Sequence, residues 1–488
     1  MILVILLVLI LYISSSLALV PNNIKNMFNN MNDKKDIIPI LDSQNHQIPK
    51  WEDFLSKVMI TDVGLKLKNE ENLRLIGEGL PHTDAKIRLF GSKGEPRVVF
   101  YRDTAAWCPY CQKVWILLEE KQIPYKIEKI NMRSYGDKPA SYLKLVPNGL
   151  LPAISIDGRF QTESLDIMLN LDRTFTEPNH KSMWPDSNNP EFERAKSLMR
   201  LERDLFSRWC NLVFRPSIGG SSKKFFEEGF DEVNKQLGVT DGPWFLNSLS
   251  IVDLTYITHI ERMFASVAYW SGIKLRGDSR WPNIERWIRA FEQLPSYMAT
   301  KSDYYTHVMD IPPQYGSGYS LPESEIIASK IDGTDGTWSL PLPPFNPSID
   351  IEPVHPNNDP GFEESKHEAA YKIINNYENI IKFSLRGAGK PGTKQFQAPL
   401  ADPYAIPAIE YYDDFNILLR ILVQCLLGDY NQVQSLPIIN RNVSTKNKLI
   451  SSLEYLRDRI GVPRDMSYPA ARQLRAHINY IKTLLNSA

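Results

Sequence analysis

The order of elements predicted for residues 97 to 177 constrains the fold of this chain more than any other feature. The stretch "RVVFYRD" is typical of a short buried strand, and an apolar pattern at helical spacing follows it. "IPYKIEKI" alternates apolar and polar residues, as a half-buried strand requires. "LPAISIDGRFQTES" places Asp157-Gly158 between two extended pieces, which predicts an antiparallel hairpin. A further helix is expected from Glu163. The predicted order is strand, helix, strand, hairpin and helix.

This order is that of a thioredoxin-like α/β domain, which we assign to residues 93–178. Residues 184–310 carry helical patterns throughout, and Ser250 with Asp253 fits a capping box at one helix start. Prolines and glycines make 311–360 a predicted linker, because they cannot sustain a helix or a sheet interior. Further helices predict an all-α domain over 361–488.

Size and charge narrow the classes of function. At 488 residues the chain is too long for one ordinary hydrophobic core. Its 56 basic and 57 acidic residues give a net charge of −1, and this near-neutral balance removes the main electrostatic argument for nucleic-acid binding. We expect no nucleic-acid partner. Four cysteines in a chain of this length do not form a disulfide scaffold.

The first residues, "MILVILLVLILYISSSLALVP", form an uncharged apolar run. We expect a targeting segment over 1–20, although no positively charged region precedes it and an uncleaved anchor stays open. Residues 21–92 are predicted to be a polar leader and linker with a short helix. The leader suits delivery to a plastid through a secretory-type route, with the ER or secretion as the alternative. The mature chain is expected to have no membrane partner.

Two of the four cysteines, Cys108 and Cys111, stand at the predicted start of the helix that follows the first strand. Pro109 then occupies the first helical position, where its missing N–H costs nothing. Cys108 becomes the N-cap, where unpaired backbone N–H groups and the helix dipole favour a thiolate. Cys111 lies one turn inside and is expected to be less accessible. Cys108 is therefore the predicted nucleophile, and Cys111 can at most resolve.

Other interpretations of the cysteines compete with this one. A zinc pair would need two further ligands, and the sequence offers neither a second C-x-x-C nor an H-x-x-x-H. We therefore expect no metal. A buried structural pair is the other alternative. Cys210 and Cys425 stand alone and are expected to be small buried apolar residues.

Two downstream segments offer binding groups. In "KLVPNGLLPAI" a cis bond between Leu151 and Pro152 would turn the Leu151 backbone toward the Cys108 helix, where it could hold an extended peptide. A simple loop proline is the alternative. Glu163 and Ser164 in "QTESLDI" are either ordinary helix caps or a site for a group carrying both an amine and a carboxylate.

Together these motifs resemble the glutathione transferase superfamily: the C-P-Y-C helix start, the "VPNGLLP" loop, the "ES" pair and a helical second domain bearing "SIVDL". The cysteine nucleophile is similar to that of omega-like and glutaredoxin-like members. More narrowly, "RLFGSKGEPRVVFYRDTAAWCPYCQKVWILLEEKQIPY" and "VPRDMSYPAARQLRAH" resemble a branch from photosynthetic lineages with a C-terminal helical extension.

The resemblance implies roles for individual residues. Cys108 would form a mixed disulfide with glutathione, the Leu151 backbone would pair with the cysteinyl unit, and Pro152 would be cis. Glu163 and Ser164 would hold the γ-glutamyl end. By spacing alone, Lys138 would contact the glycyl carboxylate; the alternative is a solvated surface lysine. Tyr110 would line the mouth of the cleft. Cys111 leaves monothiol and dithiol cycles both open, since omega-like members commonly have one cysteine here. The resemblance assigns no role to the C-terminal domain.

The leading hypothesis is a glutathione-dependent thiol transferase or reductase that acts on a small-molecule or protein disulfide, with glutathione as co-substrate and a homodimer as an open question. A second hypothesis is conjugation or isomerisation of an apolar electrophile. A third is a non-catalytic glutathione-binding assembly protein.

Overall fold

The computed structural model describes residues 48–217, 220–396, 398, 400–431, 433 and 436–487. The expected targeting segment and the polar residues that follow it, up to residue 47, lie outside the described residues. Across the described ranges, no helix combines the length and the apolar character that crossing a bilayer demands.

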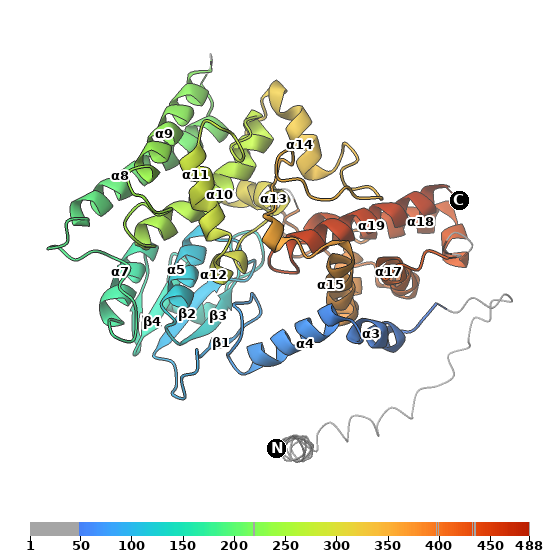
Figure 1. Cartoon of the computed structure of the whole chain (residues 1–488). Coiled ribbons are helices and arrows are strands. Elements are labelled where there is room, and N and C mark those ends of the chain that lie inside the picture. Colours follow the sequence, from blue (N-terminus) through green and yellow to red (C-terminus); the bar gives the residue numbers. More distant parts are fainter. Residues whose placement is uncertain are drawn as a thin grey trace, which may run out of the picture. The chain divides into compact units, whose positions relative to one another are not determined.

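The sheet has five strands in the order β1-β3-β2-β4-β5. Only β2 and β3 run parallel, and the other neighbours pair antiparallel. Helix α5 connects β2 to β3, as the sequence predicts (Figure 1). The strands are β1 (Ile87–Arg88), β2 (Val98–Asp103), β3 (Tyr125–Ile130), β4 (Ala153–Ile156) and β5 (Arg159–Gln161). The thioredoxin-like fold is thus confirmed, but the predicted domain start at residue 93 falls after β1.

The hairpin between β4 and β5 has the predicted two-residue turn. Ile156 pairs with Arg159, and Asp157 and Gly158 have φ angles of 50° and 80°. Positive φ at both central residues is the requirement of a type I′ turn, which Asp-Gly meets at low cost. The hairpin fixes the edge of the sheet and the start of the helix that follows it.

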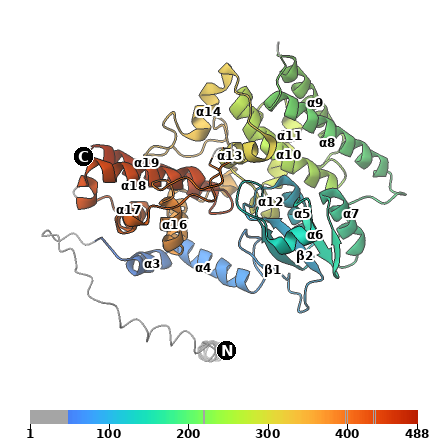
Figure 2. The same cartoon turned by 180° about the vertical axis from the view of Figure 1, so that it is seen from behind.

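Helices surround this sheet and continue beyond it (Figures 1 and 2). Those of the sheet domain are α5 (Pro109–Glu120), α6 (Ala140–Leu145) and α7 (Ser164–Thr174). The second, all-helical part contains α8 (Phe192–Val213), α9 (Ser221–Leu237), α10 (Ile251–Ser271), α11 (Pro282–Phe291), α12 (Pro295–Met298) and α13 (Tyr304–Tyr315). Nearly every residue of α10 is buried, so this helix forms the centre of the second part.

The capping box predicted at the start of α10 is present. The Ser250 hydroxyl and backbone N–H both bond to Asp253, at 2.8 and 3.0 Å. Asp253 also accepts from the indole of Trp287 at 3.0 Å. Burial raises the pKa of Asp253 to about 6. This cap therefore ties the first turn of the central helix to its neighbour α11.

The C-terminal helices form a second hydrophobic core, separate from that of the sheet and α10. They are α15 (Phe362–Ile374), α16 (Tyr377–Ser384), α17 (Tyr412–Leu426), α18 (Val443–Arg459) and α19 (Tyr468–Ser487). Helix α14 (Glu325–Asp332) precedes them and packs through Ile331 against the first core instead. Short 3₁₀ helices η1 (Pro322–Ser324), η2 (Pro356–Asn358), η3 (Ile409–Tyr411) and η5 (Pro437–Asn440) lie in connecting segments.

The segment before the sheet domain is more structured than a polar linker. It forms α3 (Trp51–Met59) and α4 (Asp62–Leu75). Trp51, Phe54 and Val58 of α3 are buried in the C-terminal core. In both views α3 and α4 lie beside α15, although they are far from it in sequence (Figures 1 and 2). The sequence pattern could not predict this packing, because α3 is short and meets the C-terminal helices only in the tertiary structure.

The predicted linker 311–360 also differs from the expectation. Helix α13 continues to Tyr315, and α14 lies wholly within the range. The remaining Pro- and Gly-rich stretch has little regular structure, as predicted, but it is anchored, because Trp338 and Glu352 are buried. Irregular backbone is therefore held here by single side chains.

Candidate functional site

Cys108 is the N-cap residue of α5, and Pro109 occupies the first helical position, as predicted. The Gln112 backbone N–H donates to the Cys108 carbonyl at 2.9 Å, which opens the helix at this point. Cys108 is 8% exposed and Cys111 is 1% exposed. The expected order of accessibility therefore holds, but Cys108 is itself largely covered.

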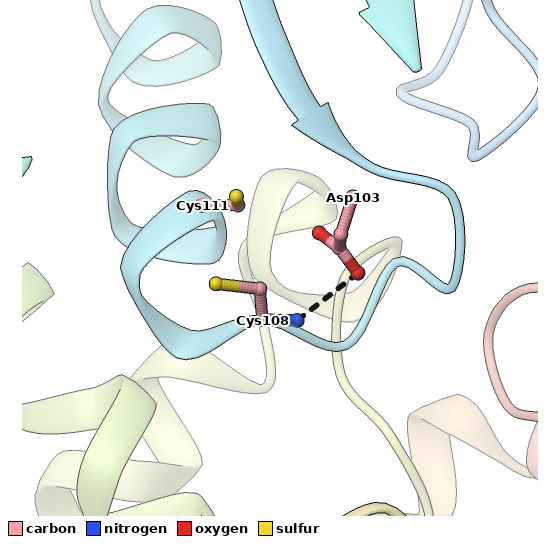
Figure 3. Close-up of side chains that lie close together, drawn as sticks. All are labelled: Asp103, Cys108 and Cys111. Atoms are coloured by element: carbon pink, nitrogen blue, oxygen red, sulfur yellow. Dashed lines mark hydrogen bonds between the residues drawn. The ribbon is translucent and has the colours of Figure 1, made fainter. Parts of the chain in front are cut away.

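Asp103, the last residue of β2, lies beside both cysteines (Figure 3). Its Oδ2 accepts the backbone N–H groups of Trp107 at 2.7 Å and Cys108 at 3.1 Å. One carboxylate oxygen of Asp103 and the sulfurs of Cys108 and Cys111 all lie within 4.8 Å of one another. The carboxylate thus braces the loop that presents the nucleophile and also reaches the thiols. Sequence analysis missed it, although a carboxylate closing the strand just before the cysteine was visible.

The buried Cys111 thiol is held in its neutral form. Burial raises the pKa of Cys111 well above its ordinary value, and the neighbouring Cys108 adds to the shift. A neutral thiol is a poor nucleophile, so Cys111 reacts only if a nearby group takes its proton. Asp103 is the carboxylate within reach.

The same three groups raise the question of a metal. A structural zinc site needs four ligands, and the group found among the described residues supplies only three. The geometry suits thiol chemistry better, because two sulfurs at this separation can close a disulfide after a small movement.

The Leu151–Pro152 bond is cis, as the sequence suggested. Ala153, the next residue, pairs with Tyr101 of β2, so the loop lies beside the strand that leads to Cys108. The Tyr142 hydroxyl donates to the Leu150 carbonyl at 2.6 Å and fixes the loop. Leu151 is half-buried and Pro152 is buried.

Glu163 and Ser164 begin α7, but neither side chain caps the helix. Glu163 is exposed and has a φ of 65°, which is unfavourable for a residue other than glycine and costs of order 1–3 kcal/mol. Ser164 is buried at the first helical position. The capping interpretation is therefore wrong, and the strained backbone places an acidic group and a hydroxyl at the helix N-terminus.

Lys138 is not a solvated lysine, because it is half-buried and donates to the Asn131 carbonyl. Burial lowers the pKa of Lys138, and the thiols of Cys108 and Cys111 act in the opposite direction. Lys138 is anchored on a loop that Asn131 ties to Thr104 at 3.0 Å.

Tyr110 is half-buried on the first turn of α5. Its ring packs edge-on against His259 of α10, with centroids 5.5 Å apart, and burial raises its pKa. The Lys113 ammonium lies 5.1 Å from the ring centroid. Burial lowers the pKa of Lys113 to about 8, against the opposing effects of Glu202 and Cys108. Lys113 is a second residue that sequence analysis missed.

The helical part fixes the cysteine loop from the other side. The Trp107 indole donates to His307 Nδ1 at 3.0 Å, and His307 Nε2 donates to Glu261 at 2.8 Å. Glu261 also accepts from the Gln112 amide at 3.1 Å. Burial lowers the pKa of His307, and the neutral tautomer satisfies both bonds. The residue before Cys108 is thus held by α13.

Cys210, expected to be buried, is instead half-buried on α8, whereas Cys425 is fully buried.

Comparisons with known proteins agree with this arrangement. The family model described as the N-terminal domain of glutathione S-transferase matches residues 107–174, and the model of the C-terminal domain matches 224–290. Glutathione S-transferase L3 of Arabidopsis thaliana is 31% identical over 202 residues, which cover 41% of this chain and 81% of that protein.

A further relative is Glutathione S-transferase L2, chloroplastic, of the same species, which is 28% identical over 225 residues, or 45% of this chain and 73% of that protein. Among solved structures, glutathione transferase Omega 3C from Trametes versicolor aligns over 43% of this chain and 91% of its own, with 24% identity and a TM-score of 0.37.

Proposed function

The chain belongs to the glutathione S-transferase family, and we propose that it is a glutathione-dependent thiol transferase or reductase with Cys108 as the nucleophile. The observation that carries the proposal is the position of Cys108 at the N-terminus of α5, with a second thiol and a carboxylate beside it. A transferase that activates glutathione with a tyrosine or serine hydroxyl would not need two thiols and a carboxylate at this position.

In the first step the Cys108 thiolate attacks the glutathione sulfur of a mixed disulfide. A new S–S bond joins Cys108 to glutathione, the old S–S bond breaks, and the substrate leaves as a thiolate that takes a proton from water. The covered position of Cys108 favours a small disulfide over a folded protein as the substrate.

Glutathione contacts are proposed from the positions of the flanking groups. The Leu151 backbone before Pro152 pairs with the cysteinyl unit, and Glu163 with Ser164 holds the γ-glutamyl end. Lys138, a half-buried ammonium group held by the Asn131 carbonyl, binds the glycyl carboxylate. Tyr110 lines the entrance.

Two routes release the mixed disulfide. A second glutathione thiolate attacks the bound glutathione sulfur and leaves as oxidised glutathione, which regenerates the Cys108 thiolate. Alternatively, Cys111 transfers its proton to Asp103 and attacks Cys108, which releases glutathione and leaves an internal disulfide for two further glutathione molecules to reduce. The closeness of the three groups supports the second route.

Replacement of Cys108 tests the nucleophile. Cys108→Ser should lower glutathione-coupled reduction of a small disulfide such as hydroxyethyl disulfide by about 100-fold or more, because a hydroxyl is not ionised at neutral pH. Cys210→Ser is the matched control and should keep full turnover. Unchanged turnover in Cys108→Ser would remove this residue from the mechanism.

A second candidate function is conjugation of an apolar electrophile. Half-buried aromatic rings extend from His259, which Tyr110 contacts. The Phe206 ring lies 4.9 Å from His259 and 6.2 Å from Tyr315, and Phe214 stacks on Tyr315 at 6.0 Å. Such rings suit an apolar second substrate. Consumption of electrophiles with no disulfide reduction in the same preparation would favour this function over the first.

We also propose a plastid location. The apolar run at the start of the sequence supports it, as does the relative named chloroplastic. Imaging of a fluorescent fusion to the full chain would decide between the plastid and the ER.

A further inference from the structure

A cavity of about 770 Å³ lies between α4, α15, α16 and the segment that joins α18 to α19. His82 and Lys372 line it, and they also line an adjoining cavity of about 630 Å³. The region lies where α4 extends from α15 toward β1 (Figure 1). Cavities of this size hold small metabolites. Neither cavity is lined by Cys108, Cys111 or Asp103, and the larger one reaches the surroundings of the thiol site at Thr104.

Two hydrogen-bond donors face each other in this cavity. His82 Nδ1 accepts the backbone N–H of Asp84 at 2.9 Å, so the ring proton is on Nε2. His82 Nε2 lies 3.5 Å from the Lys372 ammonium nitrogen, which is also a donor. Burial and the neighbouring Lys372 lower the pKa of His82 to about 3, so the imidazole is neutral. An acceptor that lies beside this pair can therefore bond to both donors at once.

Arg74 of α4 adds a second positive charge. Its guanidinium acts on His82 in the same direction as Lys372. In the ranges that the structure describes, neither Arg74 nor Lys372 has a carboxylate oxygen within 4.0 Å. The acidic residues of the cavity are engaged elsewhere: Asp84 pairs with Lys129 at 3.0 Å, Glu71 with Lys68 at 2.8 Å, Asp465 with Arg464 at 2.7 Å, and Glu70 lies 4.0 Å from Lys66.

We propose that this cavity binds a phosphate group, as free phosphate or as the phosphate ester of a small metabolite, between Arg74, His82 and Lys372. The three side chains come from α4, the loop after it and α15, and all of them line this cavity. A tetrahedral oxyanion can accept from three directions at once. The remaining volume accommodates the organic part of an ester.

The position of the cavity gives the site a link to the thiol chemistry. Thr104 lines the cavity and directly follows Asp103, which braces the Cys108 loop. An ester whose organic part fills the cavity would therefore reach the same loop from a site built with the C-terminal domain. The site does not depend on the proposed thiol function.

Calorimetric titration of the full chain with inorganic phosphate, at ionic strength held constant with sodium chloride, tests the proposal. Saturable binding near one equivalent is expected. Lys372→Met and Arg74→Met should each weaken it about 10-fold, the loss of one charge-assisted hydrogen bond. Lys382→Met, an exposed lysine on α16, is the matched control and should bind like the original chain.

Several outcomes would overturn the proposal. These are the absence of saturable binding with both phosphate and sulfate, unchanged affinity in both cavity variants, or binding of acetate as tight as that of phosphate. Thermal unfolding of each variant shows whether it is folded. Should Lys372→Met fail to fold, Arg74→Met and His82→Gln carry the test.

Discussion

At the scale of single residues, Asp103 decides how the second thiol can react. Cys111 is buried and neutral, so its sulfur cannot attack the mixed disulfide unaided. Asp103 uses one oxygen to hold two backbone N–H groups, which fixes the loop. Its carboxylate also lies within 4.8 Å of the Cys111 sulfur. The residue therefore combines a structural bond with the position of a proton acceptor.

Asp103→Asn separates these two roles, because an amide oxygen still accepts from the backbone but cannot take a proton. We expect formation of the Cys108–Cys111 disulfide to slow by about 10-fold or more, with the folded structure retained. Below neutral pH this rate should become very small. Without a proton acceptor, Cys111 can react only after its thiol has ionised, which requires high pH.

The measurement is rapid-quench mass spectrometry of the internal disulfide from pH 6 to 9. A double variant supplies the control: in a Cys111→Ser background, Asp103→Asn should have little additional effect on turnover. A large additional loss in that background would mean that Asp103 acts only by holding the loop.

At the scale of elements, α13 is the helix that couples the two domains around the site. Its N-terminus is capped by Asp303, and its His307 reaches the Trp107 indole of the cysteine loop. Glu261 of α10 joins the same chain of bonds. The loop that carries the nucleophile is thus held by groups far from it in sequence.

His307→Leu should destabilise the protein by about 2–4 kcal/mol, because the Trp107 indole N–H and the Glu261 carboxylate each lose a buried partner. Turnover should fall by more than the loss of folded protein accounts for, because the loop before Cys108 is no longer fixed. Denaturant unfolding and disulfide reduction at a temperature where the variant is folded measure the two effects.

His367→Leu on α15 is the comparison, because that side chain is half-buried and far from the thiol site in sequence. If His307→Leu were as stable as the original chain, the bonds assigned to His307 with Trp107 and Glu261 would be contradicted.

At the scale of the whole molecule, the irregular segment before α15 is fastened to the body by Glu352. This carboxylic acid accepts the Tyr304 backbone N–H at 2.9 Å, at the start of α13. Burial and the neighbouring Asp303 raise its pKa to about 8. Asp303 is itself paired with Arg475 of α19 at 2.5 Å. Three parts of the chain therefore meet at one buried group of charges.

This arrangement predicts a dependence of stability on pH. The folded protein keeps the Glu352 proton up to about pH 8, whereas the ordinary pKa is 4.5. Between these values the folded state holds more protons than the unfolded state, so the free energy of unfolding falls as pH rises. Glu352→Gln keeps an acceptor for Tyr304 and should remove that part of the slope.

At pH 8 this variant should be more stable than the original chain by at least about 1 kcal/mol, the equivalent of roughly one pKa unit. Denaturant unfolding at pH 5.5 and pH 8 measures the change. Glu410→Gln, at an exposed position, should leave the slope unaltered. Equal slopes in all three proteins would show that Glu352 does not control it.

Much of the sheet domain was predictable because its signals are local. The turn at Asp157-Gly158, the proline after Cys108 and the capping box at Ser250 each depend on residues a few positions apart. The same locality explains the failures. Neither the packing of α3 into the C-terminal core nor the uncapped, strained backbone at Glu163 follows from neighbouring residues.

The sequence by itself determined the order of strands and helices, the position of Cys108 at a helix start and the family, because short-range periodicity and motif spacing encode them. Only the tertiary structure decided that Asp103 reaches both sulfurs, that His307 holds the cysteine loop and that Arg74, His82 and Lys372 surround one cavity. These contacts join residues from separate elements, and the free energies that stabilise them depend on burial, which the linear order of residues does not contain.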